Sequence, residues 1–297
     1  MDVPNIFNLA TSELSQDAAI AYNLAWADSK FKSTHPEHHA LGADLLGLFA
    51  GEYAQNLNIG NVEIQVGLQR NHIDVWVYIG CEAVLIIEDK TNSFEHGDQI
   101  NRYRGIATKW LDPEKREWGP ERVIAAYLKT GNESVNTAPN ADYLNKIDRV
   151  ALLKILNQHK HTKDEVVDQF RNYLENWENA TQSFLSSPIN EDWSWQAVEG
   201  FYVNLENEFV RRGIEIIKWE YVPNQLGGFL AFYWNWVEVP VFNCELYLQI
   251  RQGKELEIRV SGARDENGEH VRANSKLRWQ LLGRLQEIAK AEKYSGL

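Results

Sequence analysis

The spacing of apolar residues predicts helices at the start of the chain. An apolar stripe with the three- to four-residue interval of an amphipathic helix runs from Leu14 to Ala25, and Thr11 or Ser12 can cap its first turn. A polar connection that contains Pro36 follows, and a second stripe predicts a helix over 40–54. The chain therefore opens with two helices.

The period of the pattern then changes from 3.6 to 2, which is typical of β-strands. Residues 62–69 and 72–79 alternate between apolar and polar side chains, whereas residues 83–87 are apolar on both faces, as in a central strand. A helical pattern returns over 98–110, and residues 122–128 form a further apolar run. This order of elements predicts an α/β fold with a mixed sheet core flanked by helices.

The second half of the chain predicts a separate arrangement of strands and helices. Residues 143–184 read as mostly helical, and Ser186-Ser187-Pro188 is the best boundary, which gives a core with a helical extension over 1–187 and a C-terminal portion over 188–297. The two portions can also pack as one unit. The C-terminal portion is expected to be mainly antiparallel β plus α, with helices near 194–212 and 272–292 and strands near 214–222, 228–239, 242–250 and 255–261.

Composition places the chain among soluble globular proteins. Of its 297 residues, 44% are hydrophobic and 24% are charged, and no run approaches the roughly 18 apolar residues of a membrane span. The N-terminus lacks the pattern of a signal peptide. Cys81 and Cys244 are the two cysteines, too few for a disulfide scaffold or a Cys-based zinc site. We therefore expect a cytoplasmic protein that does not bind membranes.

The net charge of −12 argues against a protein whose whole surface binds nucleic acid, because such binding depends on Lys and Arg neutralising phosphates. It leaves room for a local basic strip beside an acidic metal site. The aromatic run 229–236 can stack on bases, but its alternation favours a strand in the core. A further group of residues lacks the spacing of metal ligands and is interpreted as solvated loop histidines: His35, His38, His39, His159 and His161.

The most informative stretch is the predicted hairpin 72–90. If residues 80–82 form a three-residue turn, Asp74 lies directly opposite Glu88, and Lys90 shares their face of the sheet. Opposed like charges are destabilising. A two-residue turn would break this register, and an ordinary solvated Glu/Lys pair at a hairpin end is the alternative interpretation.

A bound divalent cation would offset the repulsion between these carboxylates. Mg²⁺ prefers oxygen ligands and commonly uses one or two carboxylates together with water and substrate phosphate. Asp74 and Glu88 can supply the carboxylates, and Lys90 can hold or deprotonate a water molecule and offset charge on phosphorus. The hairpin therefore predicts a site for phosphodiester chemistry.

These residues resemble the PD-(D/E)xK phosphodiesterase superfamily of nucleases, and in particular its bacterial branch of PD-(D/E)xK nuclease superfamily proteins. Asp74 takes the place of the first acid, Glu88-Asp89-Lys90 that of (D/E)xK, and Gln99 with Tyr103 that of a downstream Gln-x-x-x-Tyr element. The segments 5–18 and 219–229 are similar to the N- and C-terminal portions of that branch. Two positions depart from the pattern: Ile73 replaces the proline, and Gln16 stands where some relatives have histidine.

The resemblance implies a restriction-endonuclease-like core and further site residues. Gln99 can anchor a water molecule, while Tyr103 and Arg102 can contact phosphate, and Asp89 can add its main-chain carbonyl to the metal ligands. The alternative interpretation, that Gln99 and Tyr103 lie at the polar edge of an amphipathic helix without a role in the site, stays open. The other expected contributors are Glu13 as an additional acid, with Asp17, Glu63 and Glu52 as less favoured substitutes, and Arg104 and His96 as nucleic-acid contacts.

The expected activity is Mg²⁺-dependent hydrolysis of nucleic-acid phosphodiester bonds, with Mn²⁺ able to substitute and DNA favoured over RNA as the substrate. Two alternatives stay open: a catalytically silent nucleic-acid-binding module, and an effector subunit that a partner triggers. The chain can also form a homo-oligomer or bind a regulatory partner.

Overall fold

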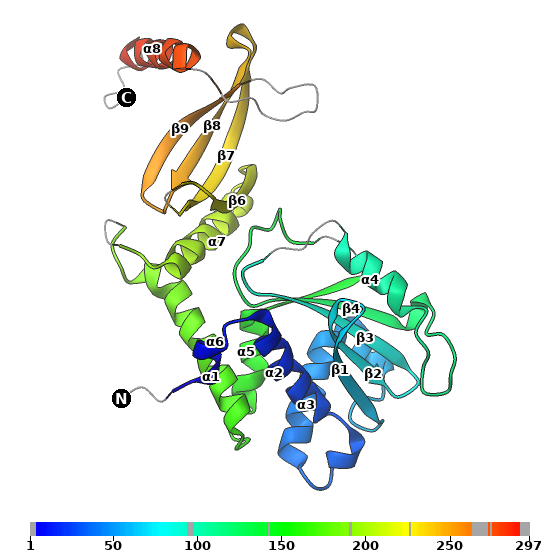
Figure 1. Ribbon diagram of the computed structural model, residues 1–297. Coiled ribbons are helices and arrows are strands. Elements are labelled where there is room, and N and C mark those ends of the chain that lie inside the picture. The colour runs from blue at the N-terminus through cyan, green and yellow to red at the C-terminus, as the bar shows by residue number, and fades with distance from the viewer. Residues whose placement is uncertain are drawn as a thin grey trace. The chain divides into compact units, whose positions relative to one another are not determined.

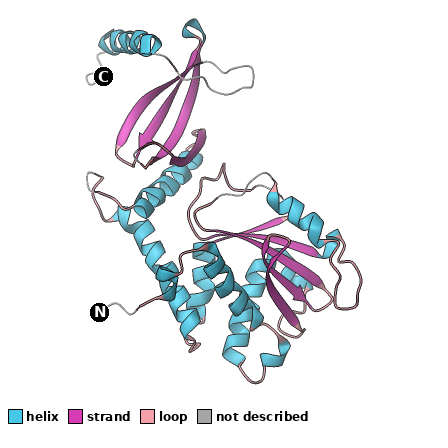
Figure 2. Cartoon of the chain, viewed as in Figure 1, coloured by secondary structure: helices cyan, strands magenta, loops and turns pink. Residues whose placement is uncertain are grey.

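The computed structural model describes residues 4–93, 98–139, 141, 143–189, 192–225, 227–262, 273 and 275–291. These residues form two compact units, each with its own sheet (Figures 1 and 2). Unit 1 comprises Met1–Glu133 and Thr137–Ser183, and unit 2 comprises Ser134–Asn136 and Phe184–Leu297. The chain is an α/β protein, as the hydrophobic pattern predicts.

Unit 1 is built on a five-stranded mixed sheet with the order β1-β2-β3-β4-β5. The first three strands form an antiparallel meander, and β3, β4 and β5 run parallel to one another. Strand β3 is therefore central, and its eight residues are all buried. The strands are β1 (Ile64–Arg70), β2 (Ile73–Ile79), β3 (Ala83–Lys90), β4 (Val123–Lys129) and β5 (Leu144–Asp148).

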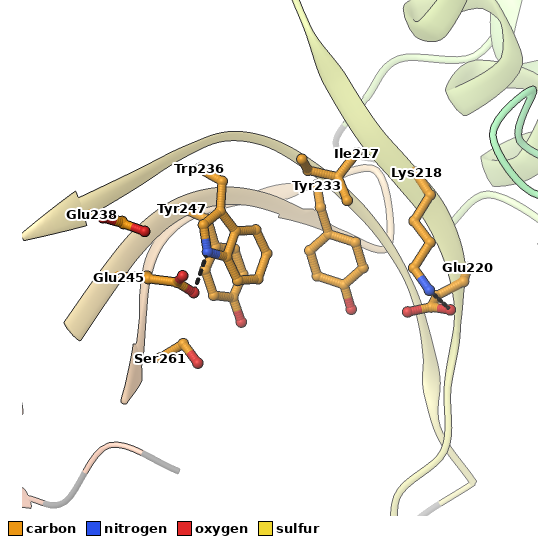
Figure 3. Close-up of a pocket in the computed structure, with 9 residues that line it drawn as sticks. All are labelled: Ile217, Lys218, Glu220, Tyr233, Trp236, Glu238, Glu245, Tyr247 and Ser261. Atoms are coloured by element: carbon orange, nitrogen blue, oxygen red, sulfur yellow. Dashed lines mark hydrogen bonds and ion pairs between the residues drawn. The ribbon is translucent and has the colours of Figure 1, made fainter. Parts of the chain in front are cut away.

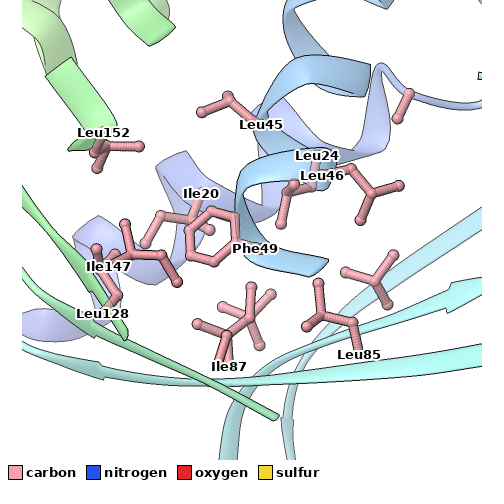
Figure 4. Packing of buried hydrophobic residues seen from close by; sticks show 14 of the residues in the cluster. Ile20, Leu24, Leu45, Leu46, Phe49, Leu85, Ile87, Leu128, Ile147 and Leu152 are labelled. Atoms are coloured by element: carbon pink, nitrogen blue, oxygen red, sulfur yellow. The ribbon is translucent and has the colours of Figure 1, made fainter. Parts of the chain in front are cut away.

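Helices cover both faces of this sheet. One face packs against α2, α3, α5 and α6 through a large apolar cluster in which Phe49 contacts the layer of Leu85 and Ile87 (Figure 4). The other face carries α4 over a second cluster that includes Val84 and Ile86. The helices are α1 (Ile6–Leu9), α2 (Glu13–Ala25), α3 (Pro36–Ala50), α4 (Gln99–Ala107), α5 (Arg149–Gln158) and α6 (Glu165–Gln182), with 3₁₀ turns at Ser29–Phe31, Gly51–Asn56 and Pro120–Arg122.

Unit 2 is an antiparallel sheet of four strands with helices. Helix α7 packs on one face of the sheet through Tyr202, which lies against Trp219 and Phe232. The buried Glu206 carboxylate accepts hydrogen bonds from Ser134 Oγ at 2.6 Å and from the Trp219 indole at 3.2 Å. The elements are α7 (Trp195–Arg211), β6 (Ile216–Val222), β7 (Phe229–Val239), β8 (Cys244–Arg251), β9 (Glu255–Gly262) and α8 (Ser275–Ala291), with 3₁₀ turns at Ser183–Leu185 and Pro240–Phe242.

Several sequence predictions about these elements were wrong. The stretch 143–184, predicted as mostly helical, contains α5 and α6 but begins with strand β5, which has only five residues and buries Leu144 and Ile147, three positions apart as on a helix face. The second helix starts at Pro36, an amino acid suited to a first helical turn, and ends at Ala50 because Gly51 adopts a φ of 59°. The histidines at 39 and 159 are buried rather than solvated: His39 Nε2 lies 3.1 Å from the Gly60 carbonyl and His159 pairs with Asp44 at 2.7 Å.

Candidate active site

The predicted three-residue turn and register are present in the β2–β3 hairpin. Ile79 pairs with Ala83 across residues 80–82, and the register continues to Val75 opposite Ile87. The next position on each strand is Asp74 and Glu88, and the main-chain amide of Asp89 donates to Asp74 Oδ2 at 3.0 Å. The two carboxylates are therefore neighbours at the end of the hairpin.

Lys90 completes the cluster. Its Nζ atom forms a short ion pair with Glu88 Oε1 and lies 3.7 Å from Asp74 Oδ2. Side chains alternate along β3, so Glu88 and Lys90 point to the face that carries α4 while Asp89 points to the opposite face. The structure thus brings Asp74, Glu88 and Lys90 together as the sequence indicates.

Burial makes this cluster electrostatically strained. The Glu88 side chain is only 2% exposed, and burial together with the negative charge of Asp74 raises its pKa to about 7. Burial alone would lower the pKa of Lys90, but its contact with Glu88 and the charges of Asp74 and Glu13 raise it above its ordinary value. Lys90 is therefore firmly protonated in this arrangement.

Helix α4 adds two of the predicted residues. Gln99 is the first residue of the helix, and its Nε2 atom donates to Glu88 Oε1 at 2.6 Å and to Tyr103 Oη at 2.9 Å. Residues four apart share one helix face, which places the Tyr103 hydroxyl beside the same amide. The predicted Gln-x-x-x-Tyr pair therefore contacts the acidic cluster directly.

The Asp89 carboxylate faces the other side of the sheet, where α2 holds it. Gln16 Nε2 donates to both of its oxygens, at 2.6 and 2.8 Å, and the carboxyl groups of Asp17 and Asp89 hydrogen-bond to each other. Burial, followed by the charge of Asp74, raises the pKa of Asp17 to about 7. Burial, followed by the charge of Asp17, raises the pKa of Asp89. Only the main-chain carbonyl of Asp89 lies on the side of Lys90, from which it accepts a hydrogen bond at 3.2 Å.

Glu13 lies at the C-terminal end of β3, beside the residues that follow Lys90, and the described contacts include no hydrogen bond or ion pair between it and Asp74 or Glu88. Its Oε1 atom accepts hydrogen bonds from the Thr91 amide at 2.9 Å and from Ser93 Oγ at 2.8 Å. It thereby fixes the chain just after Lys90. Glu52 lies in the 3₁₀ turn that follows α3 and Glu63 just before β1, and neither takes part in the described contacts of the cluster.

The basic residues predicted to contact nucleic acid are placed differently from one another. Arg102 is exposed on α4 and its guanidinium lies 6.0 Å from the centre of the Tyr103 ring. Arg104 turns away toward the Pro120 carbonyl, at 3.0 Å, and stacks on Tyr143. His96 lies outside the described residues.

Two lysines that sequence reasoning missed share the face of the acidic cluster. Lys129 of β4 pairs with Lys90 of β3. Tyr127 of β4 pairs with Glu88 on one side and with Lys146 of β5 on the other, so Lys146 is on the same face of the sheet as Glu88. Lys129 donates to the Ser93 carbonyl at 2.5 Å, and Lys146 is exposed. An apolar run that ends in lysine over 123–129 was a visible signal, but only the strand order shows that it lies beside Lys90.

The donor set suits a hard divalent cation. Glu88 Oε2 is buried and has no hydrogen-bond partner among the described residues, and it lies in a cluster where Asp74 adds a second carboxylate. Within the described ranges, no three His, Cys, Asp or Glu side chains are grouped as a complete metal site. Two carboxylates and a carbonyl leave positions for water and substrate oxygens, as Mg²⁺ prefers.

Comparison with known proteins adds no relative to this picture: no family model, no curated protein and no solved structure matches the chain. Among the helices that the structure describes, none combines the length and apolar character needed to cross a bilayer.

Proposed function

We propose that the protein is a Mg²⁺-dependent nuclease of the PD-(D/E)xK type, acting on nucleic-acid phosphodiester bonds with DNA as the favoured substrate. The observation that carries the proposal is the convergence of Asp74, Glu88 and Lys90 at the end of two neighbouring strands, with a buried Glu88 oxygen that has no hydrogen-bond partner in the described part of the chain. The restriction-endonuclease-like identity of unit 1 is part of the proposal. It is supported by the strand order, with β3 and its motif at the centre of a mixed sheet.

The carboxylates of Asp74 and Glu88 and the carbonyl of Asp89 would hold the cation. Mg²⁺, for which Mn²⁺ can substitute, would polarise the phosphoryl oxygens and lower the pKa of a bound water. Gln99 keeps Glu88 in place through its hydrogen bond of 2.6 Å, and Gln69 donates to Asp74 Oδ1 at 3.3 Å. These two amides orient the carboxylates.

Lys90 acts by positioning and by charge. Its raised pKa keeps the ammonium protonated, so it serves as a hydrogen-bond donor to the attacking water and offsets negative charge that builds on the phosphoryl group. The Tyr103 hydroxyl, beside Gln99, is a second donor at the same position. Glu13 supports this end of the strand by holding the Thr91 amide.

A strip of three lysines supports the proposed binding of a polyanion. Lys90, Lys129 and Lys146 come from three adjacent strands and lie on one face of the sheet. Substrate phosphates on either side of the scissile bond would follow this strip, with Arg102 on α4 as a further contact. Lys90 is paired with Asp74 and Glu88, and Lys129 and Lys146 interact with the Glu133 carboxyl group, so the strip would contact phosphate with a divalent cation offsetting the carboxylates.

The proposal predicts that the acidic pair is retained for activity. A buried Glu88 carboxylate beside the half-buried Asp74 carboxylate destabilises a fold that does not use the pair, which argues against a catalytically silent module. An effector that needs a partner would keep the same cluster and is distinguished only by experiment.

The test is a cleavage panel. The purified chain is incubated with end-labelled single- and double-stranded DNA and RNA, linear and circular, in Mg²⁺, Mn²⁺ or chelator. Cleavage of at least one substrate that requires the metal and is lost in Lys90→Ala is the expected result. The matched control is Lys154→Ala, an exposed lysine on α5, which is expected to cleave like the parent. Binding without cleavage under every condition would support the silent module instead.

A further inference from the structure

The end of the β1–β2 hairpin brings an arginine to the face of the sheet that carries α4. Leu68 pairs with Val75, which is part of the core cluster on the α2 side of the sheet. Two residues later, Arg70 pairs with Ile73, which is part of the cluster under α4. Between them Gln69 has a left-handed backbone with a φ of 52°, which interrupts the alternation of β1. The Arg70 side chain therefore lies on the face of the proposed active site.

The backbone at this hairpin end is strained. Gln69, Asn71 and His72 all have a positive φ, and strain of this kind is concentrated at functional sites. Asn71 and His72 form a two-residue turn, for which left-handed residues match the twist of the hairpin. Gln69 lies outside that turn, opposite Asp74, and its amide donates to Asp74 Oδ1 at 3.3 Å. The same distortion thus places Gln69 against a proposed metal ligand and Arg70 on the α4 face.

Arg70 lies in an aromatic cradle formed by Trp76, Tyr78 and Trp110. The central carbon of its guanidinium is 4.0 Å from the centre of the Trp110 ring and 5.4 Å from that of Trp76. Its Nη1 atom donates to the Tyr78 hydroxyl at 2.7 Å. Trp110 is held in turn by the hydrogen bond of its indole to Asn71 Oδ1 at 3.1 Å. The cradle fixes the orientation of the arginine through the face of its guanidinium.

The edge of the Arg70 guanidinium has donors left for a ligand. Within the described part of the chain, the Tyr78 hydroxyl is the one acceptor bonded to it, and no carboxylate lies within ion-pair distance. Four other arginines of unit 1 pair with carboxylates: Arg116, Arg122, Arg149 and Arg171. A guanidinium carries five N–H donors in its plane, so contact with a ring through its face leaves most of them available. The half-buried Arg70 is thus a positive group suited to an anion.

Arg70 and the strip of lysines flank the acidic pair from opposite sides. The sheet has the order β1 to β5, so Arg70 comes from one edge, Asp74 and Glu88 from the strands next to it, and Lys129 and Lys146 from the far side. Neighbouring strands are about 4.8 Å apart, so the row from β1 to β5 extends over about 19 Å. A polyanion that follows this row has cations on both sides of the acidic pair.

We propose that Arg70 binds a phosphate of the nucleic-acid substrate, on the side of the scissile bond opposite the strip of lysines, with Trp76 and Trp110 holding its guanidinium in place. A guanidinium fork donates two parallel hydrogen bonds to a phosphate, which an ammonium group does not match. The proposal rests on the proposed nuclease function. Arg70 contributes to the affinity for nucleic acid and takes no part in the proton transfers of the reaction.

Fluorescence anisotropy of labelled single- and double-stranded DNA and RNA tests the proposal over a series of salt concentrations. Ca²⁺, which takes oxygen ligands in a more flexible geometry than Mg²⁺, is the cation, and a gel checks that the probe stays intact. We expect Arg70→Gln to bind the best probe about tenfold more weakly, and the slope of log affinity against log salt to fall by about one, because one phosphate contact is lost. Arg116→Gln removes the same charge from an exposed arginine paired with Asp112, and is expected to bind like the parent.

Two conservative variants separate the phosphate contact from the packing of the cradle. Arg70→Lys keeps the charge but not the fork, so we expect the salt slope of the parent with an affinity several-fold weaker. Tyr78→Phe keeps the ring and removes the hydroxyl that orients Nη1, and is expected to weaken binding several-fold with the slope unchanged. Binding by Arg70→Gln with the affinity and salt slope of the parent, or an equal loss in Arg116→Gln, would overturn the assignment.

The result is distinguishable from failure of the nuclease proposal. Binding that depends on Arg70, with no cleavage in any metal ion, would support the phosphate contact and contradict the nuclease. Cleavage that is lost in Lys90→Ala while Arg70→Gln binds like the parent would support the nuclease and overturn the role of Arg70. A parent that binds neither DNA nor RNA would overturn both.

Discussion

Replacement of Glu88 by glutamine separates the stability of the acidic cluster from its function. Glutamine keeps the shape of the side chain and can still accept the hydrogen bond from Gln99, but it removes the negative charge beside Asp74. The variant should therefore relieve repulsion when no metal ion is bound. It should also abolish the ability of a divalent cation to stabilise the protein.

The size of the effect follows from the pKa of Glu88. Burial and the charge of Asp74 raise this pKa from 4.5 to about 7, and each pKa unit corresponds to about 1.4 kcal/mol. The ionised carboxylate in the folded protein therefore costs roughly 3 kcal/mol relative to the unfolded chain. Because the folded pKa is raised, this cost is absent below about pH 4.5, grows through the range up to about pH 7, and is complete above it.

The assay is urea unfolding in chelator at pH 5 and pH 8, with and without Mg²⁺. We expect the free energy of unfolding of Glu88→Gln to exceed that of the parent by less than about 1 kcal/mol at pH 5 and by roughly 3 kcal/mol at pH 8. Mg²⁺ should raise the stability of the parent at pH 8 and leave the variant unchanged. Glu52→Gln, an exposed carboxylate of the same unit, is the control for charge removal. A variant that is less stable than the parent at pH 8 in chelator would refute the reasoning.

Three further predictions concern other parts of unit 1. Lys146→Ala should raise the KM for nucleic acid several-fold with little change in kcat and reduce the slope of log affinity against log salt by about one, whereas Lys154→Ala should change neither. Asp164→Asn keeps an oxygen that can cap α6 but replaces the acceptor of the Tyr22 hydroxyl, 2.5 Å away, by an amide NH₂ group, and should cost ~1 kcal/mol at pH 7. Those bonds hold the pKa of Asp164 below its ordinary value of 3.8 despite partial burial, so chemical denaturation should show the variant and parent converging as the pH falls through that range. Gly131→Ala would place a Cβ atom 2.0 Å from the Thr91 carbonyl oxygen, and thermal unfolding should show a loss of roughly 1–3 kcal/mol.

The sequence was sufficient to predict the central hairpin because its signals are local. Alternation fixed the faces of β2 and β3, and the odd-length turn fixed the register that makes Asp74 and Glu88 neighbours. The Gln99–Tyr103 spacing likewise required only the helical period. Each of these features depends on residues within about 30 positions of one another.

Features that depend on how distant segments pack were not predicted. The order of the parallel strands places Lys129 beside Lys90. The residues of β4 alone do not indicate which strand pairs with β4. Asp17 looked like a local residue of the first helix, yet packing of α2 on the sheet buries it against Asp89. Strand β5 is short and at the sheet edge, so its pattern was too brief to separate from the helix that follows.

The aromatic run of β7 shows the same division. Alternation correctly indicates a strand with one face in the core, where Phe232 and Trp234 lie. The bulge at Asn235 has no sequence signature strong enough to reveal that Trp236 faces the other way. The sequence alone therefore could not show that the Trp236 side chain lies on the face of the sheet opposite α7 (Figure 3).

The central claim is that Asp74, Glu88 and Lys90 form one catalytic unit around a divalent cation. Its most direct test is the single-turnover cleavage rate of the preferred substrate at saturating protein, compared among the parent, Asp74→Asn, Glu88→Gln and Lys90→Ala in Mg²⁺. The expected result is a fall of at least about a hundredfold in each variant, with folding intact by circular dichroism. Cleavage by all three variants at the rate of the parent, or cleavage by the parent that persists in chelator, would contradict it.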